Sequence, residues 1–414
     1  MSLVGQRVEL DIGPIAHGGH CVARLDGRVV FVRHSLPGER VVATITDGDD
    51  KASFLRADAV EILEAAPGRT ESRCPVSGPG GCGGCDFQHV DLVTQRALLG
   101  VVVSEQLRRL AGIDRDVVVE APDDGDGLGW RTRVAFRSDS EHRLGLRRHR
   151  SHDVIPVDPC PIADPRLSEL TAHRWPAEKV EGVVSSHDEV LAIVHETSAR
   201  LPKVALDGLV DASGERLRGR THLREQVRGR DFRVTGSGFW QVHPRAASIL
   251  VEAVLDYVRP EPGERIADLY SGVGLFSAFL AEQVGSAGRV LSVESGKVAT
   301  RDAKRNLHDL PNVTLVGASV EDAFDGGHVG TSCDAVVLDP PRTGARSAVV
   351  RHIVALAPSR VVYVACDPAA LARDVATFAE HGYELAELRA FDLFPMTHHV
   401  ECVALLERTG SDLR

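Results

Sequence analysis

A cysteine near the end of the sequence has the surroundings of a nucleophile. Cys366 ends the apolar run RVVYVAC, and Asp367 and Pro368 follow it at once. Asp is a favoured N-cap and Pro a favoured first helical residue, so a helix is expected to begin there. The partial positive charge at a helix N-terminus favours a thiolate, although Asp367 and Asp374 oppose ionisation. The alternative is a cysteine that only packs as a small hydrophobe.

A carboxylate that could serve as the matching base is Glu401, near the start of a final alternating strand. If this strand is antiparallel to the others, its first residue lies at their carboxyl edge and faces Cys366. A thiolate that adds to carbon 6 of uracil makes carbon 5 nucleophilic, and a base must later remove the carbon-5 proton. Over a methyl-donor site, the pair Cys366 and Glu401 therefore predicts methylation of uracil at carbon 5.

The segment ADLYSGVGLFSAFLAEQVGSAGRVLSVES predicts the site of the methyl donor. It has the order strand, glycine turn, helix, strand and acid, and Gly272 and Gly274 let the backbone approach a ligand. Glu294 ends the second strand 26 residues after Asp268, where a carboxylate can bind two ribose hydroxyls. The third glycine of a dinucleotide motif is absent, which favours a nucleoside cofactor such as S-adenosylmethionine over NAD. A glycine turn with no ligand is the alternative.

The segment CDAVVLDPPRTG adds an acid to the same edge and narrows the reaction. Asp339 ends its buried strand, and two prolines stiffen the loop that follows. Arg342 stands where a methyltransferase of amino-adenine would need an aromatic residue to stack the base. This loop also lacks the cysteine after a proline that a cytosine-5 enzyme carries.

Four further cysteines form a candidate metal site. Cys74, Cys82 and Cys85 have the spacing C-x7-C-x2-C in a glycine-rich segment, and Cys160 follows in VDPCPI. Three close thiolates and a distant one could hold zinc or an iron–sulfur cluster, and spacing alone does not choose between them. We expect the chain to be cytoplasmic, which argues against disulfides. The remaining cysteines are expected to pack as small hydrophobes: Cys21, Cys333 and Cys402.

The charge distribution bears on the partner. The formal net charge of −11 argues against nucleic acid, but seven arginines gather in residues 131–150 and seven more in 216–233. Arginine suits phosphate contact and stacking on bases, whereas the alternative for each cluster is a solvated strand face. No apolar run is long enough for a membrane span, so we expect no membrane partner. We also expect a monomer.

The elements that position these residues predict three domains. Residues 1–66 read as short strands with an Asp-Gly hairpin and predict a small β-barrel. Residues 67–235 hold the cysteines and arginine-rich strands, together with one helix over 91–113 whose N-cap is Asp91. This helix could pack on the catalytic domain. Residues 236–414 alternate strands and helices, which predicts an α/β fold with a parallel sheet.

The motifs together resemble the RNA uracil-5-methyltransferases that act on tRNA and 23S ribosomal RNA, over nearly the whole chain. DPPR, CDPAALARD and HVE are the specific matches, and HGGHCVARLDGRVVFVRHSLPGE resembles the TRAM domain, an OB-like RNA-binding barrel. The resemblance implies a class I, Rossmann-like methyltransferase domain with Cys366 as nucleophile and Glu401 as base. It also implies that S-adenosylmethionine contacts five residues: Gln241, Tyr270, Glu294, Asp322 and Asp339.

The resemblance extends to the cysteines, for which it implies a [4Fe-4S] cluster in the central β-rich domain, with zinc as the alternative. The first gap is longer than is usual in the family. We expect this centre to serve RNA binding or folding, because it ties the loop to the arginine-rich domain.

Three residues depart from the family pattern and bear on the details of the pocket. His243 replaces the asparagine of FxQxN, Leu275 replaces a polar residue of the glycine loop, and Met396 stands where histidine is common. The barrel and the cysteines favour 23S ribosomal RNA over tRNA as substrate. The alternative from another class is a metal-cluster RNA-binding protein or RNA chaperone that has lost methyl transfer.

Overall fold

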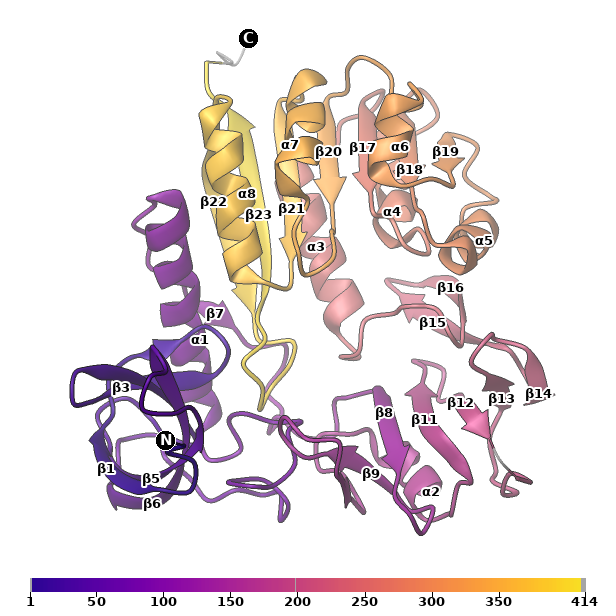
Figure 1. Cartoon of the computed structure of the whole chain (residues 1–414). Helices are drawn as coiled ribbons and strands as arrows, with labels where there is room; N and C mark the ends of the chain where they lie inside the picture. The colour runs from indigo at the N-terminus through magenta and orange to yellow at the C-terminus, as the bar shows by residue number, and fades with distance from the viewer. Residues whose placement is uncertain (1, 198, 411–414) are drawn as a thin grey trace.

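The computed structural model describes residues 2–197 and 199–410, which form three parts with separate sheets (Figure 1). The N-terminal barrel and a central sheet lie below the large C-terminal sheet in this view. Among the described residues, no helix combines the length and apolar character that crossing a membrane requires.

The N-terminal part is a curved sheet of six strands in the order β1-β5-β6-β4-β3-β2. The predicted hairpin is present: Leu25 pairs with Arg28, and Asp26 and Gly27 between them have positive φ, as a two-residue turn requires. Alternate residues of β4 and β5 point inward and are fully buried, which forms the predicted barrel core. The strands are β1 (Arg7–Asp11), β2 (Ile15–Ala16), β3 (His20–Leu25), β4 (Arg28–Arg33), β5 (Arg40–Asp47) and β6 (Phe54–Glu64).

The central part is a seven-stranded sheet in the order β10-β9-β8-β11-β12-β13-β14, packed around the buried Trp175 and Phe136. The cysteine-rich segment that precedes it contains neither helix nor strand, as its glycines predict. The elements are β8 (Arg133–Ser138), β9 (Leu144–Arg147), β10 (Val154–Pro156), η2 (Pro165–Leu167), α2 (Ser168–Thr171), β11 (Ala177–Val184), β12 (Val190–Thr197), β13 (Gly208–Asp211) and β14 (Arg216–Gly219).

The C-terminal part is an eight-stranded sheet in the order β19-β18-β17-β20-β21-β23-β22-β7. The five predicted strands are parallel neighbours, and β23 is antiparallel to β21 and β22, as expected. The strands are β17 (Arg265–Leu269), β18 (Arg289–Val293), β19 (Val313–Val316), β20 (Ala335–Leu338), β21 (Arg360–Ala365), β22 (Tyr383–Phe391) and β23 (Glu401–Arg408). The helices are α3 (Ala246–Val258), α4 (Leu275–Val284), α5 (Lys297–Asn306), α6 (Val320–Asp325), α7 (Arg346–Ala355) and α8 (Pro368–Glu380).

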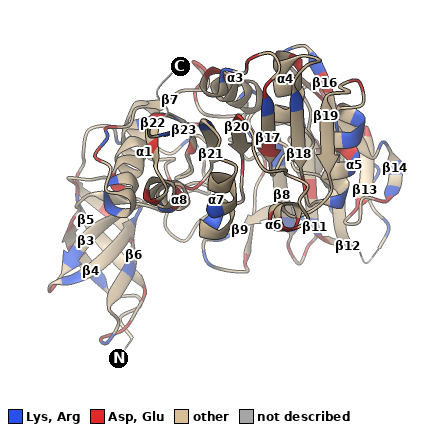
Figure 2. Ribbon diagram, turned by 90° about the horizontal axis from the view of Figure 1, so that it is seen from above, with Lys and Arg blue, Asp and Glu red and all other residues tan. Residues whose placement is uncertain are grey.

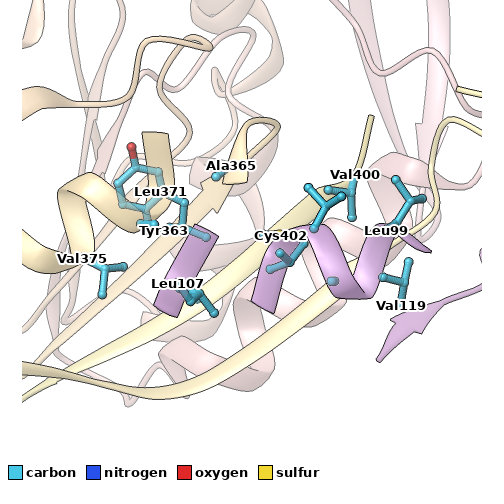
Figure 3. Close-up of a cluster of buried hydrophobic side chains, with 14 of the residues drawn as sticks. Leu99, Leu107, Val119, Tyr363, Ala365, Leu371, Val375, Val400 and Cys402 are labelled. Carbon is cyan, nitrogen blue, oxygen red and sulfur yellow. The ribbon is translucent and has the colours of Figure 1, made fainter. Parts of the chain in front are cut away.

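A segment from the N-terminal half completes this C-terminal part. Helix α1 (Leu92–Gln106) starts at its predicted N-cap, since the Asp91 side chain accepts a hydrogen bond from the Thr94 backbone N–H at 2.8 Å. It continues as the π-helix η1 (Leu107–Ala111), and both pack on α8. Strand β7 (Val119–Glu120) then pairs in parallel with β22. Figure 3 shows the shared core, with Leu99 and Leu107 beside Leu371 and Cys402.

The hairpin of β15 (His222–Val227) and β16 (Arg230–Thr235) also packs on the C-terminal part. Phe232 lies in the core with α3 and α4, and β16 contacts α5. Two buried α5 side chains anchor it: Asp302 accepts from the Thr235 backbone N–H at 2.7 Å, and Asn306 accepts from that of Arg233 at 2.8 Å.

Candidate active site

The C-terminal sheet brings Cys366 and Glu401 together. Ala365, the last residue of β21, pairs with Cys402 of the antiparallel strand β23. The next residues outward are Cys366 and Glu401, and the charge of Glu401 raises the pKa of the Cys366 thiol, so the two side chains lie near each other. Glu401 is buried and Cys366 is half-buried. The antiparallel strand expected from the sequence therefore places the two side chains as predicted.

The resting state of Cys366 differs from the expectation. Helix α8 does begin directly after it, because the Asp367 side chain accepts from the Ala370 backbone N–H at 2.8 Å. Burial, Glu401 and Asp339 nevertheless raise the pKa of the Cys366 thiol to about 12, and Arg342 lowers it only in part. The predicted activation by the helix is thus outweighed, and in the RNA-free protein the thiol is protonated.

The acids expected to oppose ionisation have other roles. Asp374 is buried and accepts hydrogen bonds from the Tyr363 hydroxyl and the Ala345 backbone N–H, both at 2.7 Å. It therefore fixes the loop that leads from β20 into α7. Asp367 also lies 3.3 Å from the His17 side chain of the barrel, which links the barrel to the residue after Cys366.

Glu401 shares the site with Asp339, which is half-buried, and both acids hold protons more tightly than usual. Burial and Asp339 raise the pKa of Glu401 well above its ordinary value. Burial and Asp268 raise the pKa of Asp339 to about 7. A carboxylate titrating near neutrality can both accept and return a proton. These acids can take the proton of the Cys366 thiol and, later, a proton from a substrate carbon.

Arg342 is a site residue that the sequence indicated only by exclusion. Its charge acts on both Cys366 and Glu401, and its Nη2 atom lies 3.3 Å from His399 Nε2. The feature of the sequence that could have identified Arg342 is its position directly after Asp-Pro-Pro, at the sheet edge where Cys366 and Glu401 lie.

The glycine loop has the shape predicted for a ligand turn. Gly272 and Gly274 have φ of 57° and 89°, the left-handed region that favours glycine. Glu294, directly after β18, accepts hydrogen bonds from the backbone N–H groups of Gly272 at 2.9 Å and Gly296 at 2.5 Å. Tyr270 is half-buried between β17 and this loop, and its φ is also positive. Glu294 and Tyr270 therefore border the loop, as expected of cofactor residues.

A buried acid beneath the loop has an unsatisfied atom. Asp268 has no solvent exposure; Ser277 Oγ donates to its Oδ2 at 2.5 Å, but Oδ1 has no hydrogen-bond partner. Burial raises its pKa to about 7. From the sequence, Asp268 marked only the end of a strand. The structure adds its hydrogen bond with Ser277 of α4 and its unpaired Oδ1.

Two predicted cofactor residues belong to other segments, before α3 and on α6. Gln241 is half-buried in the connection between β16 and α3, and Asp322 is exposed on the first turn of α6. Among the residues that the structure covers, no hydrogen bond or ion pair joins either side chain to Tyr270, Glu294 or Asp339. Their proposed contacts with S-adenosylmethionine stay predictions.

The residues that depart from the family pattern are buried in packing roles. His243 stacks on Trp130 at 5.9 Å, and its Nδ1 accepts from the Arg245 backbone N–H at 3.2 Å. Leu275 is buried at the start of α4. Met396 is buried, and its carbonyl accepts from the backbone N–H groups of Asp86 and Phe87 at 2.9 and 3.0 Å. Met396 thus joins the cysteine segment to the loop before Glu401.

The four predicted metal ligands line one small, largely apolar cavity between the cysteine segment and the central sheet: Cys74, Cys82, Cys85 and Cys160. Burial raises the pKa of three of these thiols, that of Cys85 to about 12. As placed, however, no three His, Cys, Asp or Glu side chains in the described ranges could hold a metal ion. The four thiols lie around one cavity but do not form a coordination site, and the iron–sulfur centre stays a prediction. Of the other cysteines, Cys21 and Cys402 are buried as expected, and Cys333 packs at the core edge.

Asp86, directly after Cys85, contacts the loop that leads into Glu401. Asp86 lies 2.6 Å from His398 Nδ1 and 3.5 Å from Arg33 of the barrel. Burial opposes its ionisation, but His398 and Arg33 hold its pKa below the ordinary value. Asp86 therefore ties the barrel, the cysteine segment and the loop that carries Glu401 to one another.

Both arginine clusters are partly engaged in intramolecular ion pairs, and in residues 131–150 Arg133, Arg137 and Arg143 contact Glu181, Glu178 and Asp139. In residues 216–233, Arg220 and Arg224 contact Glu189, and Arg230 contacts Asp309 and Glu282. Much of this cluster is thus engaged in intramolecular ion pairs. In residues 131–150, Arg148 and Arg150 are exposed and contact only exposed acids at 3.3 Å or more. Figure 2 shows basic residues both on the barrel strands and on β14.

Comparisons with known proteins agree with the site. Residues 220–409 match the tRNA (uracil-5-)-methyltransferase family, and residues 1–60 match the TRAM domain. An uncharacterized RNA methyltransferase of Streptomyces coelicolor is 48% identical, covering 100% of this chain and 95% of its own length. One from Bifidobacterium longum is 40% identical, covering 97% of each chain. The Pyrococcus abyssi tRNA (uracil-54, C5)-methyltransferase, solved with S-adenosyl-L-homocysteine, shares the fold with a TM-score of 0.73 at 23% identity over 96% of this chain and 99% of its own.

Proposed function

The chain belongs to the tRNA (uracil-5-)-methyltransferase family and is an RNA (uracil-5-)-methyltransferase with a TRAM domain, and from this premise we propose how its residues carry the reaction. Cys366 is the nucleophile that adds to uracil, and Glu401 is the base that removes the carbon-5 proton. The observation that supports both roles is their proximity at the carboxyl edge of the sheet.

The proton transfers follow from the acids around Cys366. When uracil enters, the Cys366 proton moves to the Glu401–Asp339 pair, and the thiolate forms a bond to carbon 6 while carbon 5 gains enolate character. Bound S-adenosylmethionine supplies the methyl group to carbon 5. Glu401, after its proton has left for solvent, takes the carbon-5 proton, and the electron pair of that bond expels the Cys366 thiolate. Arg342 balances the negative charge that the acids carry in this step.

The glycine loop is the proposed place of S-adenosylmethionine. Glu294 would accept from the ribose hydroxyls, and Tyr270 would pack on the adenine. The orphaned Oδ1 of Asp268 leaves a polar atom that a ligand can satisfy, and the space beside Gly272 lets a ligand approach the backbone. Gln241, Asp322 and Asp339 complete the proposed contacts.

A mechanism-based adduct tests the nucleophile. RNA that carries 5-fluorouridine has no removable carbon-5 proton, so methyl transfer should trap it covalently on Cys366 when S-adenosylmethionine is present. We expect a gel-shifted adduct with wild type and none with Cys366→Ala. Wild type that forms no adduct on an RNA it binds would refute the mechanism and favour a non-catalytic RNA-binding protein.

The base has a separate test with ordinary uridine. Glu401→Gln should form the methylated adduct but fail to resolve it, so the adduct should accumulate without fluorine. Glu407→Gln, at the far end of the same strand, is the matched control and should turn over normally. Normal turnover by Glu401→Gln would refute its role.

We also propose that Cys74, Cys82, Cys85 and Cys160 hold a [4Fe-4S] cluster, with zinc as the alternative. The four thiols around one cavity support this donor set, since both centres are bound by cysteine thiolates. Metal and sulfide analysis of protein purified without oxygen decides between them. Protein that lacks iron, sulfide and zinc, with Cys160→Ser equally stable, would refute the centre.

The RNA substrate is proposed to be 23S ribosomal RNA, with tRNA as the alternative, and the enzyme is proposed to act as a cytoplasmic monomer. The barrel and the cysteine centre support the ribosomal target. Nucleoside mass spectrometry of separated RNA fractions, from cells with and without the gene, should show 5-methyluridine lost from 23S RNA alone. Loss from tRNA alone would refute this choice while confirming the reaction.

A further inference from the structure

A cavity of about 690 Å³ lies between the N-terminal barrel and the central sheet. One wall comes from strands β3, β4 and β6, and the other from the turn at residues 148–150 and from Gly80 of the cysteine segment. Its volume is within the range of about 300–1,000 Å³ that small-molecule sites occupy. None of the proposed catalytic or cofactor residues lines it.

The cavity is lined by more positive than negative charge. Four arginines face it, Arg33, Arg56, Arg148 and Arg150, against the carboxyl groups of Asp47 and Asp58. The acids leave the arginines largely unsatisfied: Asp47 is exposed and lies 3.3 Å from Arg150 and 3.9 Å from Arg56. Arg33 is nearly buried; its Nη2 lies 3.5 Å from Asp86 and makes no hydrogen bond. Such guanidinium groups are suited to phosphate oxygens.

Aromatic rings stand beside these arginines. The Arg56 guanidinium lies over both Phe31 and Phe54, at 5.7 and 5.2 Å from the ring centroids. Phe54 is exposed although large and apolar, and the His20 ring packs edge-on against Phe31. Flat apolar and guanidinium surfaces next to phosphate-binding groups are what an unstacked base uses in single-stranded RNA.

The histidines of the cavity do not supply its charge. Burial and the neighbouring arginines lower the pKa of His20 and of His149 to about 4. Both rings are therefore neutral between pH 6 and 8, and the positive charge belongs to arginine alone. An anion bound here should have an affinity that is independent of pH in this range.

Chain neighbours of the lining residues contact the residue after Cys366 and the loop that leads to Glu401. His17, one residue before the lining residue Gly18, lies 3.3 Å from Asp367, directly after Cys366. Gly19 approaches His398 of the catalytic loop closely. Arg33 contacts Asp86, which in turn contacts His398. A strand of RNA whose uridine reaches Cys366 can thus continue into this cavity.

We propose that this cavity binds an unpaired nucleotide of the same RNA, close in sequence to the target uridine. Its phosphate contacts Arg148, Arg150 and Arg33, and its base packs against Arg56 and Phe31. This inference rests on the proposed function and deepens it: the substrate is a single-stranded RNA segment, held at two places, rather than a lone extruded uridine in a duplex.

Binding of a short fluorescein-labelled oligouridylate, followed by anisotropy over a range of salt, tests the site directly. Arg148→Ala with Arg150→Ala removes exposed side chains, so folding should be unaffected. We expect affinity at low salt to fall about tenfold and the slope of log affinity against log salt to fall by about 1. Phe31→Leu removes the ring against which the base packs and should weaken binding about tenfold without changing that slope.

The matched control removes two exposed arginines from helices of the C-terminal part, Arg108→Ala with Arg351→Ala. It should stay within about twofold of wild type, because neither residue lines the cavity. A cavity variant that behaves like this control would overturn the proposal. A wild-type affinity that changes strongly between pH 6 and 8 would also overturn it.

Steady-state methylation of the RNA fraction that wild type modifies separates this inference from the proposed function. Arg148→Ala with Arg150→Ala should raise KM about tenfold and leave kcat within about twofold. Unchanged binding and KM in an active enzyme would refute the nucleotide site alone. Arginine-dependent binding in a wild type that methylates no RNA would refute the proposed function and support the site.

Discussion

The protonated state of Cys366 gives a prediction that needs no RNA. A free cysteine titrates near about 8.5, whereas burial and two acids raise the pKa of this thiol to about 12. The full shift would lower the thiolate fraction near neutral pH by roughly three thousandfold. Because the side chain is only half-buried, water screens part of the effect, and we expect about a hundredfold.

Alkylation by iodoacetamide measures this shift, since the thiolate is the reacting form. The rate at Cys366 is followed by peptide mass spectrometry between pH 7 and 10 and should rise with pH throughout, with no plateau. Glu401→Gln removes the larger of the two acidic contributions and should accelerate the reaction about tenfold at fixed pH. Glu407→Gln, on the same strand but paired with Arg259, controls for the mutation itself.

A plateau in the rate below pH 8 in wild type would refute the reasoning, because it would mean that the helix prevails over the acids. Equal rates for Glu401→Gln and Glu407→Gln would show that Glu401 does not act on the thiol. The plateau would also remove the need for an acid to accept the Cys366 proton.

Three further outcomes follow from buried acids. Asp374→Ala should lower the free energy of unfolding by about 2–4 kcal/mol in urea denaturation, because it leaves the Tyr363 hydroxyl without an acceptor and the Ala345 N–H with only the Tyr363 hydroxyl at 3.1 Å. Tyr363→Phe should cost about 1 kcal/mol, because the Ala345 N–H keeps its bond to Asp374. Asp268 has a raised pKa of about 7, so the folded state binds its proton more tightly than the unfolded state, and stability should fall as pH rises from about 4 through 7. Asp268→Asn should flatten this dependence in melting curves, and an unchanged slope would contradict the assignment. Asp86→Asn should lower kcat at constant KM and speed hydrogen exchange around His398; because its pKa is depressed, its stabilising effect should be present at neutral pH and be lost as pH falls below about 4.

The sequence predicted the elements whose signal is local. Alternating strands, the Asp26-Gly27 turn and the caps at Asp91 and Asp367 depend on neighbouring residues, and each is present. The meeting of Cys366 and Glu401 was also predictable, because strand direction alone decides at which edge a residue lies.

The remaining features depend on contacts between distant segments. The pairing of Arg230 with Asp309 could not be read from composition, so the second arginine cluster looked freer than it is. Asp374 is eight residues from Cys366 in sequence, yet its carboxylate points to the backbone of Ala345. The raised pKa of the Cys366 thiol could not be predicted either. The helix that favours a thiolate is a local signal, whereas the burial and the acids that outweigh it come from other strands.

The pairing of β7 with β22 has a consequence for how the chain folds. Val119 and Ala390 pair although 271 residues of sequence separate them, so the C-terminal sheet cannot be completed until both β7 and β22 have been synthesised. During synthesis, the segment of α1 and β7 emerges long before α8 and β22, so it cannot form these contacts until the end of translation. A fragment beginning at residue 236 would lack α1 and η1, which pack on α8, and we expect it to self-associate through the apolar face of α8 that they cover. The methyltransferase domain is therefore discontinuous in sequence, and its folding unit begins near residue 92.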